Sequence, residues 1–154
     1  MLPKLQFGMF DNFKGARTLL LWGDTSGIAT LQEIFRDLSS GARNVADLHE
    51  IEWAEGRPHT GLILQRVKTT PEVAMNLHET AGTTSIVWKA TREEFGLYSE
   101  LIAPLGDTSC TAGHQYLGTD QNFPIQVIVS TGEYPDDFQC GGPSLSNAGA
   151  SETR

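Results

Sequence analysis

Three residues close together in the sequence could do chemistry as a group. Asp107, Cys110 and His114 supply the atom types of a thiol nucleophile, its general base and a carboxylate that orients the base. Such groups act only when the fold brings them within hydrogen-bond reach, and buried cysteines without reactivity are common. The three residues are therefore the candidate set for an alternative function, catalysis, while the main interpretation assigns no catalytic residue.

A second group combines carboxylates with aromatic rings near the C-terminal end. Carboxylates accept hydrogen bonds from Lys or Arg, and aromatic rings add contact area, which together suits a basic protein partner. We expect these carboxylates to flank one end of a hairpin. The predicted partner-binding residues are Asp120, Glu133, Tyr134, Asp136, Asp137 and Phe138. The alternative for the same segment is a C-terminal turn whose aromatic rings cover one end of the core.

Other motifs are weak. Residues 23–27 (Gly-Asp-Thr-Ser-Gly) lie where a predicted strand feeds a helix, a place where backbone amides can hold an anion. The stretch lacks the lysine of a phosphate-binding loop and the spaced glycines of a dinucleotide site, and Asp24 would repel phosphate, so we expect helix capping there. The histidines show no His-x-x-x-His spacing, and no Cys-x-x-Cys is present, so we predict no metal and no cofactor.

The charge of the chain is uneven along its length. The net charge over 154 residues is −8, yet residues 1–92 contain ten basic and ten acidic residues. Residues 93–152 contain nine carboxylates and no basic residue. This part of the chain would repel DNA or RNA and attract a basic protein. The alternative is that the negative charge only keeps the protein soluble.

The N-terminal residues do not match a secretory signal, and no apolar run approaches the ~20 residues that cross a bilayer. The two cysteines, Cys110 and Cys140, are too few for a disulfide framework. We therefore expect a cytoplasmic protein with reduced thiols that does not bind membranes, and the sequence leaves its oligomeric state open.

Two stretches have helical periodicity. In the first, predicted over residues 24–39, Ile28, Leu31 and Phe35 form part of an apolar stripe, with Asp24 or Thr25 as the cap. In the second, predicted over residues 91–105, Thr91 and Glu94 have the spacing of a reciprocal capping box.

The remaining regular segments read as short strands. They span residues 5–10, 18–22, 45–53, 60–67, 71–78, 83–88, 114–117 and 124–130. For residues 71–78 a single helical turn is the alternative. The order of elements predicts an α+β fold, with a mostly antiparallel, meandering sheet of about five to seven strands and two amphipathic helices on one face. Residues 1–140 would form a single domain. Residues 141–154 contain too few large apolar groups to offset the entropy of ordering them, so we expect a flexible polar tail.

Several runs in the second half of the chain resemble segments of small uncharacterised bacterial proteins, some of which are immunity proteins of polymorphic toxin systems. These runs are residues 85–95 (Ser-Ile-Val-Trp-Lys-Ala-Thr-Arg-Glu-Glu-Phe), residues 113–117 (Gly-His-Gln-Tyr-Leu) and residues 125–138. The resemblance implies a toxin-neutralising binding protein and carries over no functional residue.

Two functional hypotheses follow. The first is a non-enzymatic cytoplasmic binding protein, an immunity-type inhibitor that docks an acidic face on a basic protein. The alternative is a small enzyme whose pocket is built around His114 with Cys110 or with carboxylates. A flat acidic face would favour binding, and a deep pocket at His114 would favour catalysis.

Overall fold

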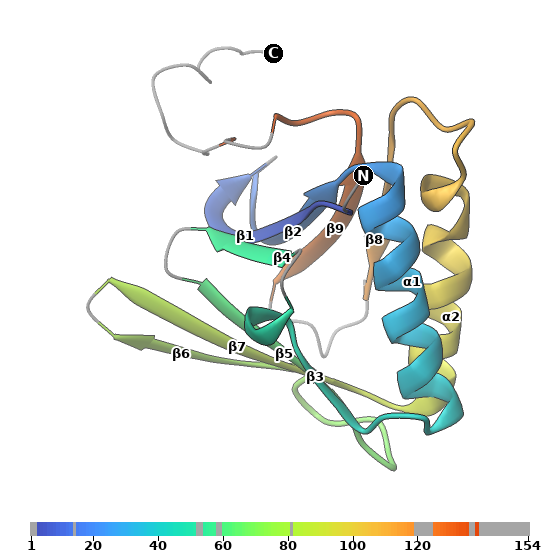
Figure 1. The fold of residues 1–154 in the computed structure, drawn as a ribbon. Coiled ribbons are helices and arrows are strands. Elements are labelled where there is room, and N and C mark those ends of the chain that lie inside the picture. The colour runs from blue at the N-terminus through green and yellow to red at the C-terminus, as the bar shows by residue number, and fades with distance from the viewer. Residues whose placement is uncertain are drawn as a thin grey trace.

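The chain folds as two β-sheets and two helices, of which a computed structural model describes residues 3–13, 15–51, 54–57, 60–80, 82–118, 125–135 and 138. Sheet A has the strand order β4 (Ala54–Arg57), β1 (Leu5–Phe13), β2 (Ala16–Gly23), β9 (Gln126–Thr131) and β8 (Gly113–Leu117). Sheet B has the order β3 (Val45–Asp47), β5 (Thr60–Arg66), β7 (Thr83–Ala90) and β6 (Met75–Thr80). Figure 1 shows the helices α1 (Thr25–Ser40) and α2 (Arg92–Ile102) side by side at one end of both sheets.

The predicted α+β class and its two helices are confirmed, the prediction of a single sheet is wrong, and the predicted antiparallel pairing is confirmed only in part. Three of the pairings are parallel: β1 with β4, β2 with β9 and β5 with β7. Alternation of apolar residues shows which side chains face the core, but it does not show which strand is the neighbour. The strands β2 and β9 illustrate this, because they lie side by side although Gly23 and Gln126 are far apart in the sequence.

Local pairings follow the sequence more closely. The strands β1 and β2 form the expected antiparallel hairpin, as do β8 and β9, whose connecting residues 119–124 are outside the described part of the chain. The single strand predicted over residues 45–53 is wrong. There β3 stops at Asp47, whose carboxylate accepts a hydrogen bond from the amide of His49 and starts the short helix η1 (Leu48–Glu50). Leu48 lies in this turn and is fully buried. An apolar residue at this position therefore does not indicate that the strand continues.

Both helices begin at the caps that the sequence indicates. The Asp24 carboxylate accepts from the amide of Gly27 at 2.6 Å, and Thr91 and Glu94 form the reciprocal capping box. The second helix ends earlier than predicted, and a short 3-10 turn, η2 (Ala103–Gly106), follows it. Within the described residues, no helix is long and apolar enough to cross a membrane.

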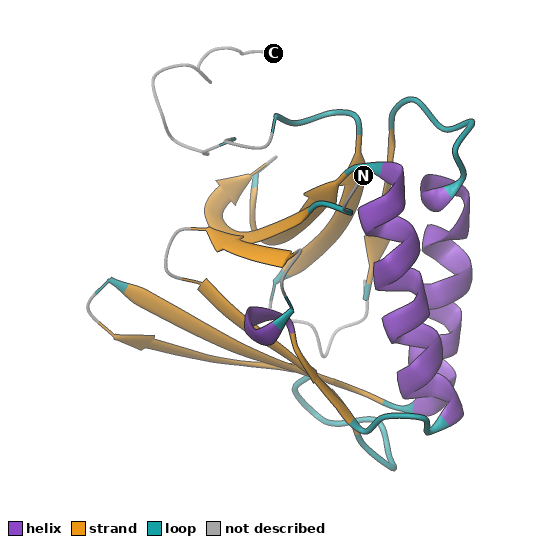
Figure 2. Ribbon diagram, viewed as in Figure 1, coloured by secondary structure: helices purple, strands orange, loops and turns teal. Residues whose placement is uncertain are grey.

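The main core lies between the helices and the faces of the two sheets that point toward them, which we call the inner faces (Figure 2). Its centre is aromatic: Phe35 on α1 lies 5.9 Å from both Trp88 on β7 and Phe95 on α2, measured between ring centroids. A smaller cluster lies on the opposite, outer face of sheet A. Side chains on the outer face of sheet B are polar or half-buried, except Val45, which is 53% exposed, and neither α1 nor α2 lies over this face in Figure 1.

Candidate functional site

A histidine, a glutamate and a serine meet on the outer face of sheet A. His114 lies on the edge strand β8, and its Nδ1 is 3.2 and 3.1 Å from the two carboxylate oxygens of Glu133. Ser130 on β9 donates its hydroxyl hydrogen to Oε1 of Glu133 at 2.7 Å. The carboxylate is thus held by two partners, while the Glu133 side chain remains 29% exposed. We call these three residues the His–Glu–Ser cluster.

Two backbone features create the cluster. The strands β8 and β9 pair with His114 opposite Ser130, so both side chains project from the same face. Directly after β9, Gly132 has φ 73°, and a Cβ on it would lie 2.0 Å from the carbonyl oxygen of Thr111. Only glycine fits at this position. The turn changes the direction of the chain, so that the Glu133 side chain reaches Ser130 and His114.

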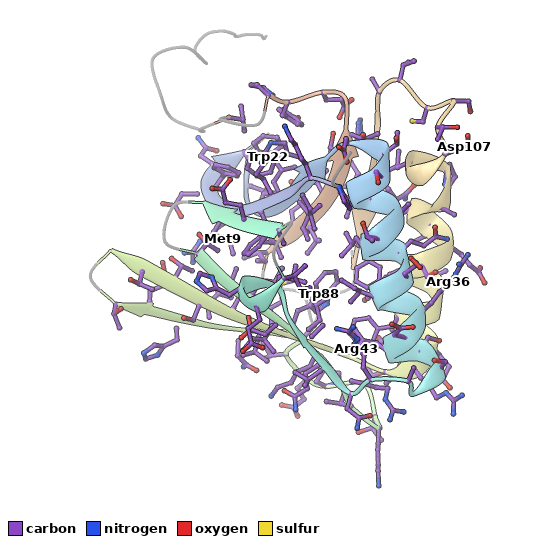
Figure 3. The ribbon with its side chains drawn as sticks, viewed as in Figure 1. Met9, Trp22, Arg36, Arg43, Trp88 and Asp107 are labelled. Atoms are coloured by element: carbon purple, nitrogen blue, oxygen red, sulfur yellow. The ribbon has the colours of Figure 1, made fainter. Side chains whose placement is uncertain are left out.

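The chain beyond this turn covers the aromatic outer face of sheet A. The indole Nε1 of Trp22, labelled in Figure 3, donates to the carbonyl oxygen of Pro135 at 2.9 Å. Phe138 is 8% exposed, and its ring centroid lies 5.5 Å from that of Phe10 and 4.7 Å from that of Tyr134. The segment therefore has a structural role as a cover.

The predicted partner-binding residues divide into three groups. Glu133 is exposed and held in place, and Tyr134 is half-buried against the aromatic cover. Phe138 is buried, so its ring has little surface to offer a partner. The other three, Asp120, Asp136 and Asp137, lie outside the described residues.

The three residues of the catalytic alternative have separate local partners. The Oδ1 of Asp107 accepts from the amide and the hydroxyl of Ser109, both at 2.9 Å, and these two hydrogen bonds lower the pKa of the Asp107 carboxyl. Cys110 is half-buried and packs against the main core, on the inner side of sheet A. His114 lies on the outer side, where it contacts Glu133. The carboxylate partner of this histidine is thus Glu133, not Asp107.

Among the described residues, the carboxylates of residues 93–152 serve different local structures. Glu94 completes the capping box of α2, Asp107 closes the turn with Ser109, and Glu133 belongs to the His–Glu–Ser cluster. Glu93 and Glu100 lie in the first and last turns of α2, on exposed positions. Part of the acidity thus serves local structure, and among the described carboxylates of this part both Asp107 and Glu133 are exposed and held by hydrogen bonds.

Among the described residues, no group of three or more His, Cys, Asp or Glu side chains is arranged to hold a metal ion. His49 lies in η1, His78 on β6 and His114 on β8, while His59 is outside the described residues.

A pocket that the sequence analysis missed lies on the outer face of sheet B. Its volume is about 420 Å³, and its lining includes Asp47, His49, Gly61, Ile63, Ser85 and Val87. None of the predicted site residues lines it. The sequence signal that could have located it is a glycine, Gly61, in the interior of a predicted strand.

Comparisons of the chain with known protein families, curated proteins and solved structures found no match.

Proposed function

We propose that the chain is a non-enzymatic, cytoplasmic binding protein that docks on a basic protein partner through Glu133 and the acidic segment that follows it. An immunity-type inhibitor of a basic toxin is the specific form of this proposal, which the resemblance to immunity proteins first raised.

The observation that carries the proposal is the fixed carboxylate of the His–Glu–Ser cluster. An exposed glutamate normally loses side-chain entropy when it meets a partner. Ser130 and His114 already hold Glu133 in one orientation, with part of its surface open to solvent. Binding to a carboxylate that is already oriented costs less side-chain entropy. A carboxylate also suits the bidentate hydrogen bonding of an arginine.

The charge distribution supports the same proposal. Residues 93–152 carry nine carboxylates and no basic residue. A field of this sign accelerates the approach of a basic protein and weakens as salt is added.

The catalytic alternative has less support from the geometry. Cys110 and His114 lie on opposite sides of sheet A, and Asp107 is engaged with Ser109. The pocket of about 420 Å³ lies on sheet B, away from His114.

The test is a capture experiment with three immobilised proteins: the unchanged chain, Glu133→Gln and Glu100→Gln. Glutamine keeps the shape of Glu133 and an oxygen for the Ser130 hydroxyl, but it removes the charge. Glu100→Gln removes the same charge from an exposed position on α2 and is the matched control. Lysate proteins captured at low salt are identified and quantified by mass spectrometry.

The expected result is one basic protein that the unchanged chain and Glu100→Gln capture, that Glu133→Gln captures much less, and that added salt releases. Equal capture by all three proteins would refute the role of Glu133. Failure to recover any basic protein would refute the proposal itself.

A further inference from the structure

The outer face of sheet B has an apolar centre, surrounded by polar residues and the exposed Val45. Strand pairing places Ile63 on β5 next to Val87 on β7, and both are half-buried. Asp47 on β3 is paired with Ile63 from the other side. Along β5 and β7 the next pair on the same face is Gly61 and Ser85. The pocket lies over these residues, with Asp47 and His49 at its β3 end.

The fold does not require glycine at position 61. A Cβ on Gly61 would meet no atom within 4 Å, and its φ lies outside the left-handed region. Gly56, in the preceding strand β4 of sheet A, is different, because a Cβ there would lie 2.0 Å from the carbonyl oxygen of Thr60. Glycine in a strand interior costs stability through backbone entropy, and one reason to find it there is the close approach of a ligand.

The lining has a definite chemistry. Its floor is aliphatic at Ile63 and Val87, and its edges carry hydroxyl groups, among them that of Ser85. Of the described lining residues, Asp47 alone has a fixed charge. The nearest lysine on this face by register, Lys89, lies beyond Val87 and outside the lining. A negative charge at one end of an apolar floor complements a positive ligand.

We propose that this pocket binds a small organic cation, namely a protonated amine carried on a flat apolar body. The flat body lies over the bare backbone at Gly61 and against Ile63, and the ammonium group pairs with the Asp47 carboxylate. A volume of about 420 Å³ is within the range of small-molecule sites. The site is separate from the His–Glu–Ser cluster, so this proposal does not depend on the existence of a basic protein partner.

The experiment is an NMR titration of the full ¹⁵N-labelled chain with two probes of similar shape and opposite charge. 2-Phenylethylamine is the cation and 3-phenylpropanoate is the anion. The titration is run at pH 8. We expect the amine to shift the amides of Gly61, Ile63 and Ser85 in a saturable way, with a Kd of about 1 mM for a fragment of this size. The anion should bind at least about fivefold more weakly.

Two variants locate the site, and each has a matched control. Gly61→Val places its Cβ where no atom lies within 4 Å and fills part of the pocket, so it should abolish binding while leaving the thermal midpoint unchanged or slightly higher. Gln65→Val adds the same side chain to the same face of β5, outside the lining, and should bind normally. Asp47→Asn keeps a side chain that can cap η1 and should remove the preference for the amine over the anion. Glu50→Gln in the same short helix should keep that preference.

The inference is overturned if the amine gives no saturable shift up to about 10 mM, a concentration that would detect even weak binding. It is also overturned if folded Gly61→Val binds as well as Gln65→Val, because the amine would then lie elsewhere. Equal affinity for the two probes would refute the assignment of a cation.

Discussion

Phe138 provides the sharpest test of how the C-terminal segment covers sheet A. Its ring is 8% exposed and packs against Phe10, Phe13, Trp22 and Tyr134, with centroid separations between 4.7 and 6.1 Å. Replacing Phe138 with alanine removes these contacts and leaves a gap over the outer face.

The magnitude follows from the area lost. A phenylalanine buries on the order of 200 Å², of which roughly half is lost on truncation to alanine, which is worth about 2.5 kcal/mol at ~25 cal/mol per Å². The lost ring pairs add to this, and partial closure of the gap subtracts. We therefore expect Phe138→Ala to lower the free energy of unfolding by about 3 kcal/mol and the thermal midpoint by about 10 °C.

The assay is urea unfolding of Phe138→Ala beside a chain truncated after Gln139. The truncated chain keeps Phe138 and loses Cys140 together with the predicted tail of residues 141–154, so its unfolding midpoint should match that of the full chain. A change below about 0.5 kcal/mol in Phe138→Ala would refute the structural role of the cover. A clearly lower urea midpoint for the truncated chain would show that the predicted tail contributes to the fold.

Three further predictions concern local contacts. Thr91→Ala breaks the capping box of α2 and should cost about 1 kcal/mol in the free energy of unfolding, measured by urea titration. Trp22→Phe keeps most of the buried ring but loses the hydrogen bond to Pro135, and the same titration should show a loss of about 1 kcal/mol. Ser109→Ala removes one of the two hydrogen bonds that lower the pKa of Asp107, so an NMR pH titration should find that pKa closer to its ordinary value of 3.8. Because folding lowers this pKa, the stability that Asp107 adds is complete above pH 3.8 and is lost as the pH falls through the lowered value.

The helices were the most predictable part of the fold. Their apolar residues recur at helical spacing over whole turns, and the caps at Asp24 and Thr91 use side chains and amides only three residues apart. Such signals lie within one segment of chain, so they do not depend on the rest of the fold.

The sheets were less predictable because their contacts cross the chain. The hairpin of β1 and β2 could be recognised from two apolar runs joined by a short loop. The parallel pairing of β2 with β9 has no local signal, since period-two alternation is the same for any neighbour. At Asp47 a side-chain hydrogen bond to the next turn ended a strand that the apolar pattern would have continued.

The candidate site shows the same limit. The sequence located Glu133 and His114 separately, one in a partner-binding segment and one in a catalytic set. Their contact depends on the register that sets His114 opposite Ser130 and on the turn at Gly132. Neither feature was predicted from the sequence. Phe138 was predicted either to contact a partner or to cover the core, and its burial is what a covering role requires.

The central claim, that the acidic segment recruits a basic partner, is tested most directly by association kinetics with the partner that the capture experiment recovers. The association rate constant is measured at two salt concentrations for the unchanged chain and for a variant with Glu133→Gln, Asp136→Asn and Asp137→Asn. We predict that the variant associates about tenfold more slowly at low salt and that its rate constant changes little with salt, because its steering charge is gone. An unchanged rate constant in the variant would contradict the claim and would show that this acidity does not recruit the partner.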